Sequence, residues 1–94
     1  MRILGLTILE AYKKKHADAR GQLEAWQVDV ERQDWKSPHD IKQRYGSADF
    51  LADNRVIFDI KGNKHRLVVH VRYQNGLVLV QWVGTHAEYS KKKF

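Results

Sequence analysis

Apolar residues in the first third of the chain recur at the spacing of amphipathic helices. Thr7 and Glu10 have the spacing of a capping box, whose two side chains satisfy free main-chain amides at a helix start, so a helix is predicted to begin at Thr7. A second helix is predicted to follow, with Asp18 as its cap. Its apolar stripe consists of Ala19, Leu23, Trp26 and Val30. The two helices are expected to form a hairpin.

The apolar pattern later changes from a helical period to a period of two. Before this change, Ser37 and Pro38 are the residue types that begin a short helix, which Gly46 would end. The β-branched and aromatic runs that follow are Arg55–Ile60, His65–Tyr73 and Leu77–Val83. Gly62-Asn63 and Asn75-Gly76 separate these runs and are typical of two-residue hairpin turns. Three antiparallel strands are therefore predicted.

Two-residue turns fix which residues of neighbouring strands face each other, and thereby the face of the sheet that each side chain occupies. Asp59 is expected opposite Arg66, and His70 opposite Gln81. The apolar face is predicted to carry Val56, Phe58, Ile60, Leu67, Val69, Val71, Tyr73, Val78, Val80 and Trp82. The polar residues predicted on the other face are Arg55, Asp59, Lys61, Lys64, Arg66, His70, Arg72 and Gln81, and its apolar residues are Ile57, Val68, Leu79 and Val83. We expect an α+β fold in which the N-terminal helices pack on one face of a small twisted antiparallel sheet and leave a basic face open.

The excess positive charge is concentrated in the last third of the sequence. The chain has 94 residues and a formal net charge of +6. Residues 1–60 hold ten basic and ten acidic side chains, whereas residues 61–94 hold seven basic side chains and one acidic side chain, Glu88. A local basic patch is typical of proteins that bind a polyanion, most often a nucleic acid. The alternative explanation is that the net charge only keeps a small protein soluble.

Length and composition also limit the class of protein. A chain of 94 residues has room for one hydrophobic core, so a single domain over residues 1–94 is expected. Without cysteine, disulfides, cysteine-type zinc sites and thiolate nucleophiles are excluded. No histidine spacing typical of a metal site occurs, so neither a metal nor another cofactor is expected. The apolar runs are too short to span a membrane and no signal peptide is evident, which predicts a cytoplasmic protein with no membrane partner.

Two groups of side chains have the chemistry to act on a nucleic acid. Arg66 lies on the predicted basic face, where a guanidinium can bind a phosphate through two parallel hydrogen bonds. A cross-strand pair between Arg66 and Asp59 is the purely structural alternative. His86 and Tyr89 follow the last strand and would lie together if this segment forms a helical turn. The structural alternative, which the spacing alone favours, is that Tyr89 packs under the sheet edge while His86 caps a turn. Histidine offers acid–base capacity near neutral pH, and tyrosine offers a ring on which a base can stack.

Several short segments, distributed in order over nearly the whole chain, match the sequence pattern of a known protein family. They are Ala25-Trp26, Asp34-Trp35-Lys36, Ser47-Ala48-Asp49-Phe50, Ile60–Val69 and Val83–Tyr89. The most specific parts are the GNK-x-RL run at residues 62–67 and the GTHAEY run at residues 84–89. Together these segments resemble the HigB toxins of the RelE/ParE superfamily.

The resemblance implies a RelE-like fold and the toxin of a type II toxin–antitoxin pair. Such a toxin is a ribosome-dependent endoribonuclease, or mRNA interferase, which cleaves translated messenger RNA. Cleavage in this family needs no metal or other cofactor, because the ribose 2′-hydroxyl attacks the adjacent phosphate. The implied partners are the ribosome, messenger RNA and a cognate helix-turn-helix antitoxin of the HigA type.

The same resemblance, combined with side-chain chemistry, assigns roles to individual residues. Arg66, with Lys61 or Lys64 beside it, would stabilise the negative charge of the transition state. His86 would act as general acid or base, and Tyr89 would stack on a splayed base. The residues assigned to RNA binding are Lys64, His70, Arg72, Gln81, Lys91 and Lys92.

The chain departs from the family pattern at three positions. Gln81 stands where an arginine is common, Arg72 where a smaller polar residue is expected, and Ser90 where an aspartate usually follows the tyrosine. Because Arg72 is expected near Gln81 on the same face, we hypothesise that Arg72 supplies the missing positive charge.

Two other functions are compatible with the sequence. A ParE-like toxin that poisons DNA gyrase would share the fold, leave RNA intact and cause DNA damage. A non-catalytic RNA-binding module would need Arg66 for affinity and would have no cleavage to lose. The pairing of His86 with Tyr89 favours the enzyme.

Overall fold

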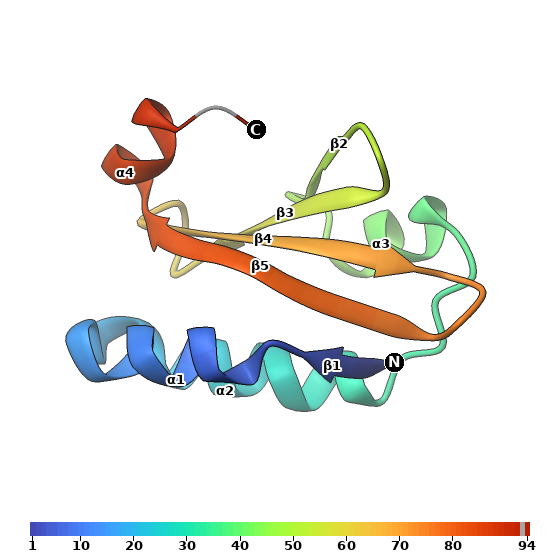
Figure 1. The fold of residues 1–94 in the computed structure, drawn as a ribbon, viewed down its shortest axis with the longest axis horizontal. Coiled ribbons are helices and arrows are strands. Elements are labelled where there is room, and N and C mark those ends of the chain that lie inside the picture. The colour runs from blue at the N-terminus through green and yellow to red at the C-terminus, as the bar shows by residue number, and fades with distance from the viewer. Residues whose placement is uncertain (93) are drawn as a thin grey trace.

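Five strands form one mixed sheet in the computed structural model of the chain, which describes residues 1–92 and 94. The elements are β1 (Arg2–Leu4), α1 (Leu6–Lys15), α2 (Ala17–Glu31), α3 (Pro38–Arg44), β2 (Asp49–Leu51), β3 (Arg55–Ile60), β4 (His65–Arg72), β5 (Leu77–Thr85) and α4 (His86–Lys91). The strand order across the sheet is β1-β5-β4-β3-β2 (Figure 1). The predicted α+β class is confirmed. The sheet differs from the expectation because β1 pairs in parallel with β5, and because the short strands β1 and β2 were not predicted.

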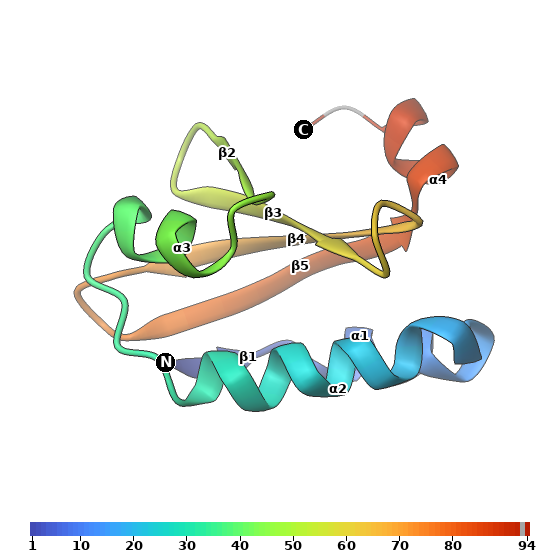
Figure 2. The ribbon, with the colours of Figure 1, turned by 180° about the vertical axis from the view of Figure 1, so that it is seen from behind.

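Helices α1 and α2 lie beside each other along one side of the sheet (Figures 1 and 2). The side chains of the predicted stripe on α2 are all buried, namely Ala19, Leu23, Trp26 and Val30. At the centre of the core, the ring of Phe58 from β3 lies 5.5 Å from the ring of Trp26 and 5.1 Å from the ring of Tyr45, between centroids. Edge-to-face contacts of this kind add specific geometry to the hydrophobic packing. They hold one face of the sheet firmly against the helices.

The predicted start of the first helix is wrong by one residue. The helix begins at Leu6 with Gly5 as its N-cap, and Thr7 lies inside its first turn. Gly5 has φ +86°, and a Cβ atom on it would lie 2.7 Å from the main-chain oxygen of Val80. The close approach to β5 therefore requires glycine at this position and fixes where the helix starts.

The second predicted cap also differs, whereas the third helix starts as expected. His16 is the N-cap of α2, and Asp18 lies in the first turn, where it contacts His65 instead of capping. Ser37 is the N-cap of α3 and Pro38 its first residue, as predicted, although the Ser37 side chain makes no capping bond.

The register of the first hairpin is confirmed. Asp59 pairs with Arg66, and Phe58 pairs with Leu67. The residues with positive φ in the connection are Lys61 and Gly62, whereas Gly62 and Asn63 were expected to adopt that conformation. The turn is closed by a hydrogen bond from the Lys64 N–H to the Lys61 oxygen at 3.3 Å, so Gly62 and Asn63 are its central residues as predicted, and only the positions with positive φ differ.

The register of the second hairpin is wrong. Arg72 pairs with Leu77, so the connection is longer than the two residues predicted, and His70 faces Leu79 instead of Gln81. A β-bulge then interrupts the β4–β5 ladder, because Val69 pairs with Val80 while Val68 pairs with Trp82. Gln81 is the extra residue on β5, which a period-two pattern does not reveal.

The bulge exchanges the faces occupied by the last residues of β5. Trp82 is paired with Val68 on the face away from the core, although it was predicted inside. Val83 packs against the core, although it was predicted outside. Gly84 makes room for this arrangement, since a Cβ atom on it would lie 2.4 Å from the Trp82 ring.

An apolar row crosses the face predicted to be open and basic. Ile57, Val68 and Trp82 are paired in succession across β3, β4 and β5. Ile57 and Val68 are 2% and 0% exposed. Arg66 lies on one side of this row and His70 on the other, so the charged residues form two separate groups instead of one continuous surface.

Candidate functional site

Helix α4 is fixed to the end of β5 by a capping box. The Thr85 hydroxyl accepts a hydrogen bond from the Glu88 main-chain N–H at 3.2 Å, and the Glu88 carboxylate accepts one from the Thr85 main-chain N–H at 2.8 Å. The bond from the Thr85 main chain lowers the pKa of Glu88 below its usual value. The main-chain N–H of His86 also donates to the Lys64 oxygen at 2.9 Å. The helix start is thus tied to both the last strand and the β3–β4 connection.

Arg66 is the centre of a cluster formed by β3, β4 and α4. One terminal nitrogen donates to the Asp59 carboxylate, and the other lies 3.0 Å from Nδ1 of His86. The guanidinium carbon lies 5.6 Å from the centroid of the Tyr89 ring, a cation–π distance. The Arg66 side chain is 14% exposed, and its Nε is buried with no hydrogen-bond partner among the described residues. Arg66, His86 and Tyr89 are therefore brought together, and the alternative pairing of Arg66 with Asp59 is present as well.

The contact with Arg66 is compatible with one tautomer of a neutral His86 ring. A guanidinium can only donate hydrogen bonds, so Nδ1 of His86 accepts this one. In a neutral imidazole with Nδ1 unprotonated, the proton is on Nε2. The contact therefore selects the tautomer in which Nε2 is the donor.

An aromatic group that sequence reasoning missed lies beside this cluster. The Trp82 ring centroid lies 6.2 Å from that of Tyr89 and 5.5 Å from that of Phe94. The rings of Tyr89 and Phe94 are stacked, with an interplanar angle of 19°. Lys92 Nζ lies 5.8 Å from the Trp82 ring centroid. Trp82 was expected in the core, and its proximity to Tyr89 follows from the β-bulge.

The structure does not bring Lys61 into the Arg66 cluster. The main-chain N–H of Lys61 donates to the Gln22 side chain of α2. Its positive charge also contributes to lowering the pKa of Asp18 on α2, after the larger effect of the hydrogen bond from His65. Lys61 thus lies toward the helix side of the hairpin. Lys64 is exposed, and its main chain supports His86.

The remaining residues assigned to RNA binding are dispersed. His70 pairs with Arg55 and Leu79 beyond the apolar row, and Arg72 lies at the far end of β4. The expected proximity of Arg72 to Gln81 is wrong, because Arg72 pairs with Leu77 and the bulge at Gln81 lies beside Val68 and Val69. Gln81 is exposed, and Lys91 and Lys92 are exposed at the end of α4. Lys93, which follows these two lysines in the sequence, lies outside the described residues.

A buried polar network supports the first residue of β4, next to Arg66. His65 is 3% exposed, and its Nδ1 lies 2.6 Å from the Tyr12 hydroxyl of α1. Its Nε2 lies 2.9 Å from the Asp18 carboxylate of α2. Burial raises the pKa of Tyr12 to about 12, so this hydroxyl stays protonated and can donate to His65. The network joins both N-terminal helices to the strand that carries Arg66.

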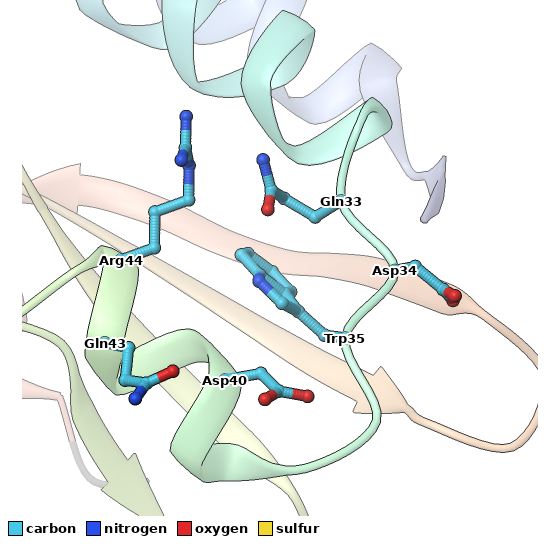
Figure 3. Close-up of a pocket in the computed structure, with 6 residues that line it drawn as sticks. All are labelled: Gln33, Asp34, Trp35, Asp40, Gln43 and Arg44. Atoms are coloured by element: carbon cyan, nitrogen blue, oxygen red, sulfur yellow. The ribbon is translucent and has the colours of Figure 1, made fainter.

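The pocket drawn in Figure 3 lies elsewhere on the molecule. It has a volume of about 430 Å³ and is lined by Gln33, Asp34, Trp35, Asp40, Gln43 and Arg44. Figure 3 shows these side chains on the segment after α2 and on α3. Within residues 1–92 and 94, no three histidine, cysteine or acidic side chains gather in a way that could hold a metal ion. None of the helices in the same part of the chain is long and apolar enough to cross a membrane.

Replacing Thr85 with alanine should loosen α4 without unfolding the sheet. Loss of a threonine cap typically costs about 1 kcal/mol, which corresponds to roughly a fivefold increase in local opening. Hydrogen exchange of the amides of residues 88–91 should accelerate by this factor, while the amides of β4 keep their protection. Thr7→Ala is the matched control, because Thr7 lies in the first turn of α1 and is not its cap. Unchanged exchange in α4 would show that the capping box does not hold the helix.

A known protein family matches most of the chain. A family model described as HigB_toxin, the RelE-like toxic component of a toxin-antitoxin system, matches residues 19–92. The matched region runs from α2 to the end of α4 and includes Arg66, His86 and Tyr89. No curated protein matches the chain.

Proposed function

Because the chain belongs to the HigB toxin family, the RelE-like toxic components of toxin–antitoxin systems, we propose that it is an endoribonuclease that cleaves messenger RNA on the ribosome. The observation that carries this proposal is the contact of Arg66 with both His86 and Tyr89. A cation, an acid–base group and an aromatic ring lie within one small cluster. These are the groups that phosphodiester cleavage without a metal requires.

In the proposed reaction, the ribose 2′-oxygen forms a bond with the adjacent phosphorus and the bond from phosphorus to the 5′-oxygen breaks. The products are a cyclic phosphate and a free 5′-hydroxyl. Arg66 stabilises the extra negative charge that develops on the phosphate oxygens. Asp59 holds the guanidinium from one side, so that its position is fixed before substrate arrives.

His86 supplies a proton to the leaving oxygen in this proposal, as an imidazolium that becomes a neutral imidazole. Because both nitrogens of an imidazolium carry protons, the contact of Nδ1 with Arg66 belongs to the neutral ring and opens when His86 is protonated. The proton of the attacking 2′-hydroxyl passes to water. Tyr89, together with the neighbouring Trp82, offers rings on which an unstacked base can lie.

An antitoxin is the partner that membership of this family implies. We propose that it is a helix-turn-helix protein of the HigA type and that an acidic segment of it contacts the toxin. The toxin has a formal net charge of +6, so a complementary negative segment would be attracted to it and would compete with RNA.

The proposed activity predicts cuts in messenger RNA that appear only on translating ribosomes. The purified chain is added to ribosomes that carry a defined message, and primer extension maps the 5′ ends. We expect new ends that carry a 5′-hydroxyl within the translated region. Intact RNA accompanied by DNA damage in cells would instead indicate a gyrase poison, and binding without any cuts would indicate a non-catalytic RNA-binding module.

A further inference from the structure

The far end of the sheet carries a second polar group that the proposed catalytic cluster does not use. Arg72 is on the same strand as Arg66, six residues further along, which corresponds to about 20 Å of extended chain. The apolar row of Ile57, Val68 and Trp82 lies between the two arginines. Arg72 is exposed and has no carboxylate partner among the described residues. Its charge is therefore available at a place separate from the cluster.

A pocket of about 430 Å³ opens at Arg72. Its lining residues are Lys36, Asn54, Val71, Arg72, Tyr73, Gln74 and Asn75. Two of these side chains are cations and three are carboxamides. Cations bind phosphate, whereas a carboxamide has both a donor and an acceptor and can pair with the edge of a base. This combination matches the chemistry of a nucleotide better than that of an apolar ligand or a simple anion.

Main-chain hydrogen bonds hold the rim of this pocket in place. The Val71 N–H donates to the Asn54 oxygen at 2.9 Å, which ties the β2–β3 connection to β4. The Asn75 N–H donates to the Arg72 oxygen at 3.2 Å, within the β4–β5 connection. Asn54 has φ +59°, a conformation that asparagine tolerates better than most residues. The polar side chains are thus presented by anchored turns.

One cation of the pocket is free to bind a ligand. Lys36 is paired only with Asp34 at 3.1 Å, and both side chains are more than 70% exposed. Exposed pairs of this kind contribute little, so a phosphate can replace Asp34 at low cost.

We propose that this pocket binds one nucleotide of single-stranded RNA at a distance from the cleaved bond. Lys36 and Arg72 contact its phosphate, and the carboxamide of Gln74, with those of Asn54 and Asn75, contacts the edge of its base. The proposal rests on RNA being the substrate of the chain. Binding of this nucleotide would influence which segment of the messenger RNA the enzyme binds.

Binding of a short single-stranded RNA with 2′-O-methyl groups tests the proposal, because this probe lacks the attacking hydroxyl. Fluorescence anisotropy gives Kd at several salt concentrations. Lys36→Ala should weaken binding and reduce the steepness of the plot of log Kd against log salt by about 0.7, the value for one phosphate contact on a single strand. Gln74→Ala should weaken binding at least about fivefold without changing the slope, because it removes a base contact. Both residues are exposed, so neither substitution should disturb the fold.

The matched controls are Lys14→Ala on α1 and Gln43→Ala in the pocket of Figure 3, both exposed and neither a lining residue of the proposed nucleotide pocket. If the two pocket variants bind RNA like these controls, the proposal is overturned, even when the chain cleaves messenger RNA as expected. If inorganic phosphate competes through Lys36 and Gln74→Ala has no effect, the pocket is an anion site and the nucleotide assignment is wrong. If RNA binding depends on the pocket but ribosomal cleavage does not occur, the nucleotide site is supported and the proposed catalytic function is wrong.

Discussion

His86→Ala is expected to lower the rate of messenger RNA cleavage about 10²–10⁴-fold, the usual contribution of a general acid or base. The proton on Nε2 is lost with the ring, and the leaving 5′-oxygen must then take its proton from water. The fold should persist, because the three hydrogen bonds that fix the start of α4 do not use the His86 ring: one is donated by its main chain and two form the capping box of Thr85 and Glu88.

Single-turnover cleavage on ribosomes measures this effect, and circular dichroism checks the fold. His39→Ala is the matched control, since His39 is exposed on α3 and belongs to no part of the cluster. Added imidazole should restore part of the activity of His86→Ala, which a purely structural role would not allow. Full activity of the variant without imidazole would exclude His86 as the acid.

Arg66→Ala should reduce cleavage by about 10²–10³-fold, the loss seen when one preorganised donor to a developing oxyanion is removed. It should also destabilise the fold, because Asp59, whose side chain is 17% exposed, loses its partner. These two effects have to be separated before the loss of activity can be assigned to chemistry.

The double variant Asp59→Ala/Arg66→Ala separates them. Without the unpaired carboxylate, stability in urea should return toward that of the wild type, while cleavage should remain low. Arg66→Lys should also cleave poorly, because an ammonium cannot contact Asp59 and His86 with the fork of a guanidinium. Arg20→Ala, an exposed change on α2, controls for loss of positive charge. Wild-type cleavage by the double variant would contradict the proposed role.

The sequence predicts the register of the first hairpin correctly and that of the second incorrectly for two reasons. Both predictions rest on a glycine–asparagine pair and an alternating pattern, and the pairing of Asp59 with Arg66 follows from them. In the second hairpin the connection is longer than Asn75-Gly76, which shifts the partners of His70 and Arg72. The alternation is then interrupted at Gln81 by a bulge, which depends on tertiary packing around Trp82 and Gly84. Local pattern rules cannot detect an extra residue when both neighbouring segments are apolar.

The short elements show the same limit. β1 and β2 have only three residues each, too few for an alternating pattern to be distinguished from chance. The pairing of β1 with β5 is also parallel and joins the two ends of the sequence, so no turn signal marks it. The capping-box pattern was assigned to Thr7, yet the same spacing at Thr85 and Glu88 is the one that forms. Only the tertiary position of Gly5 distinguishes the two cases.

Part of the candidate site was predictable. The pairing of Arg66 was read from the strands, and His86 and Tyr89 were expected to be neighbours at helical spacing. Their contact with Arg66 depends on the direction of α4 relative to β5, which the sequence pattern does not predict. The contact of the Lys61 main-chain N–H with Gln22 of α2 likewise depends on tertiary packing and has no signal in the sequence.

The bulge makes Gln81 the position of β5 at which the strand can lose a residue without moving its neighbours to the other face. Deletion of Gln81 would leave Val80 opposite Val69 and Trp82 opposite Val68 in an unbroken ladder, so Trp82 and Val83 would keep their present faces. If the ladder closed without a bulge while Gln81 remained, the Trp82 indole would turn toward the interior and Val83 to water. Functional relatives should therefore tolerate the loss of this one residue.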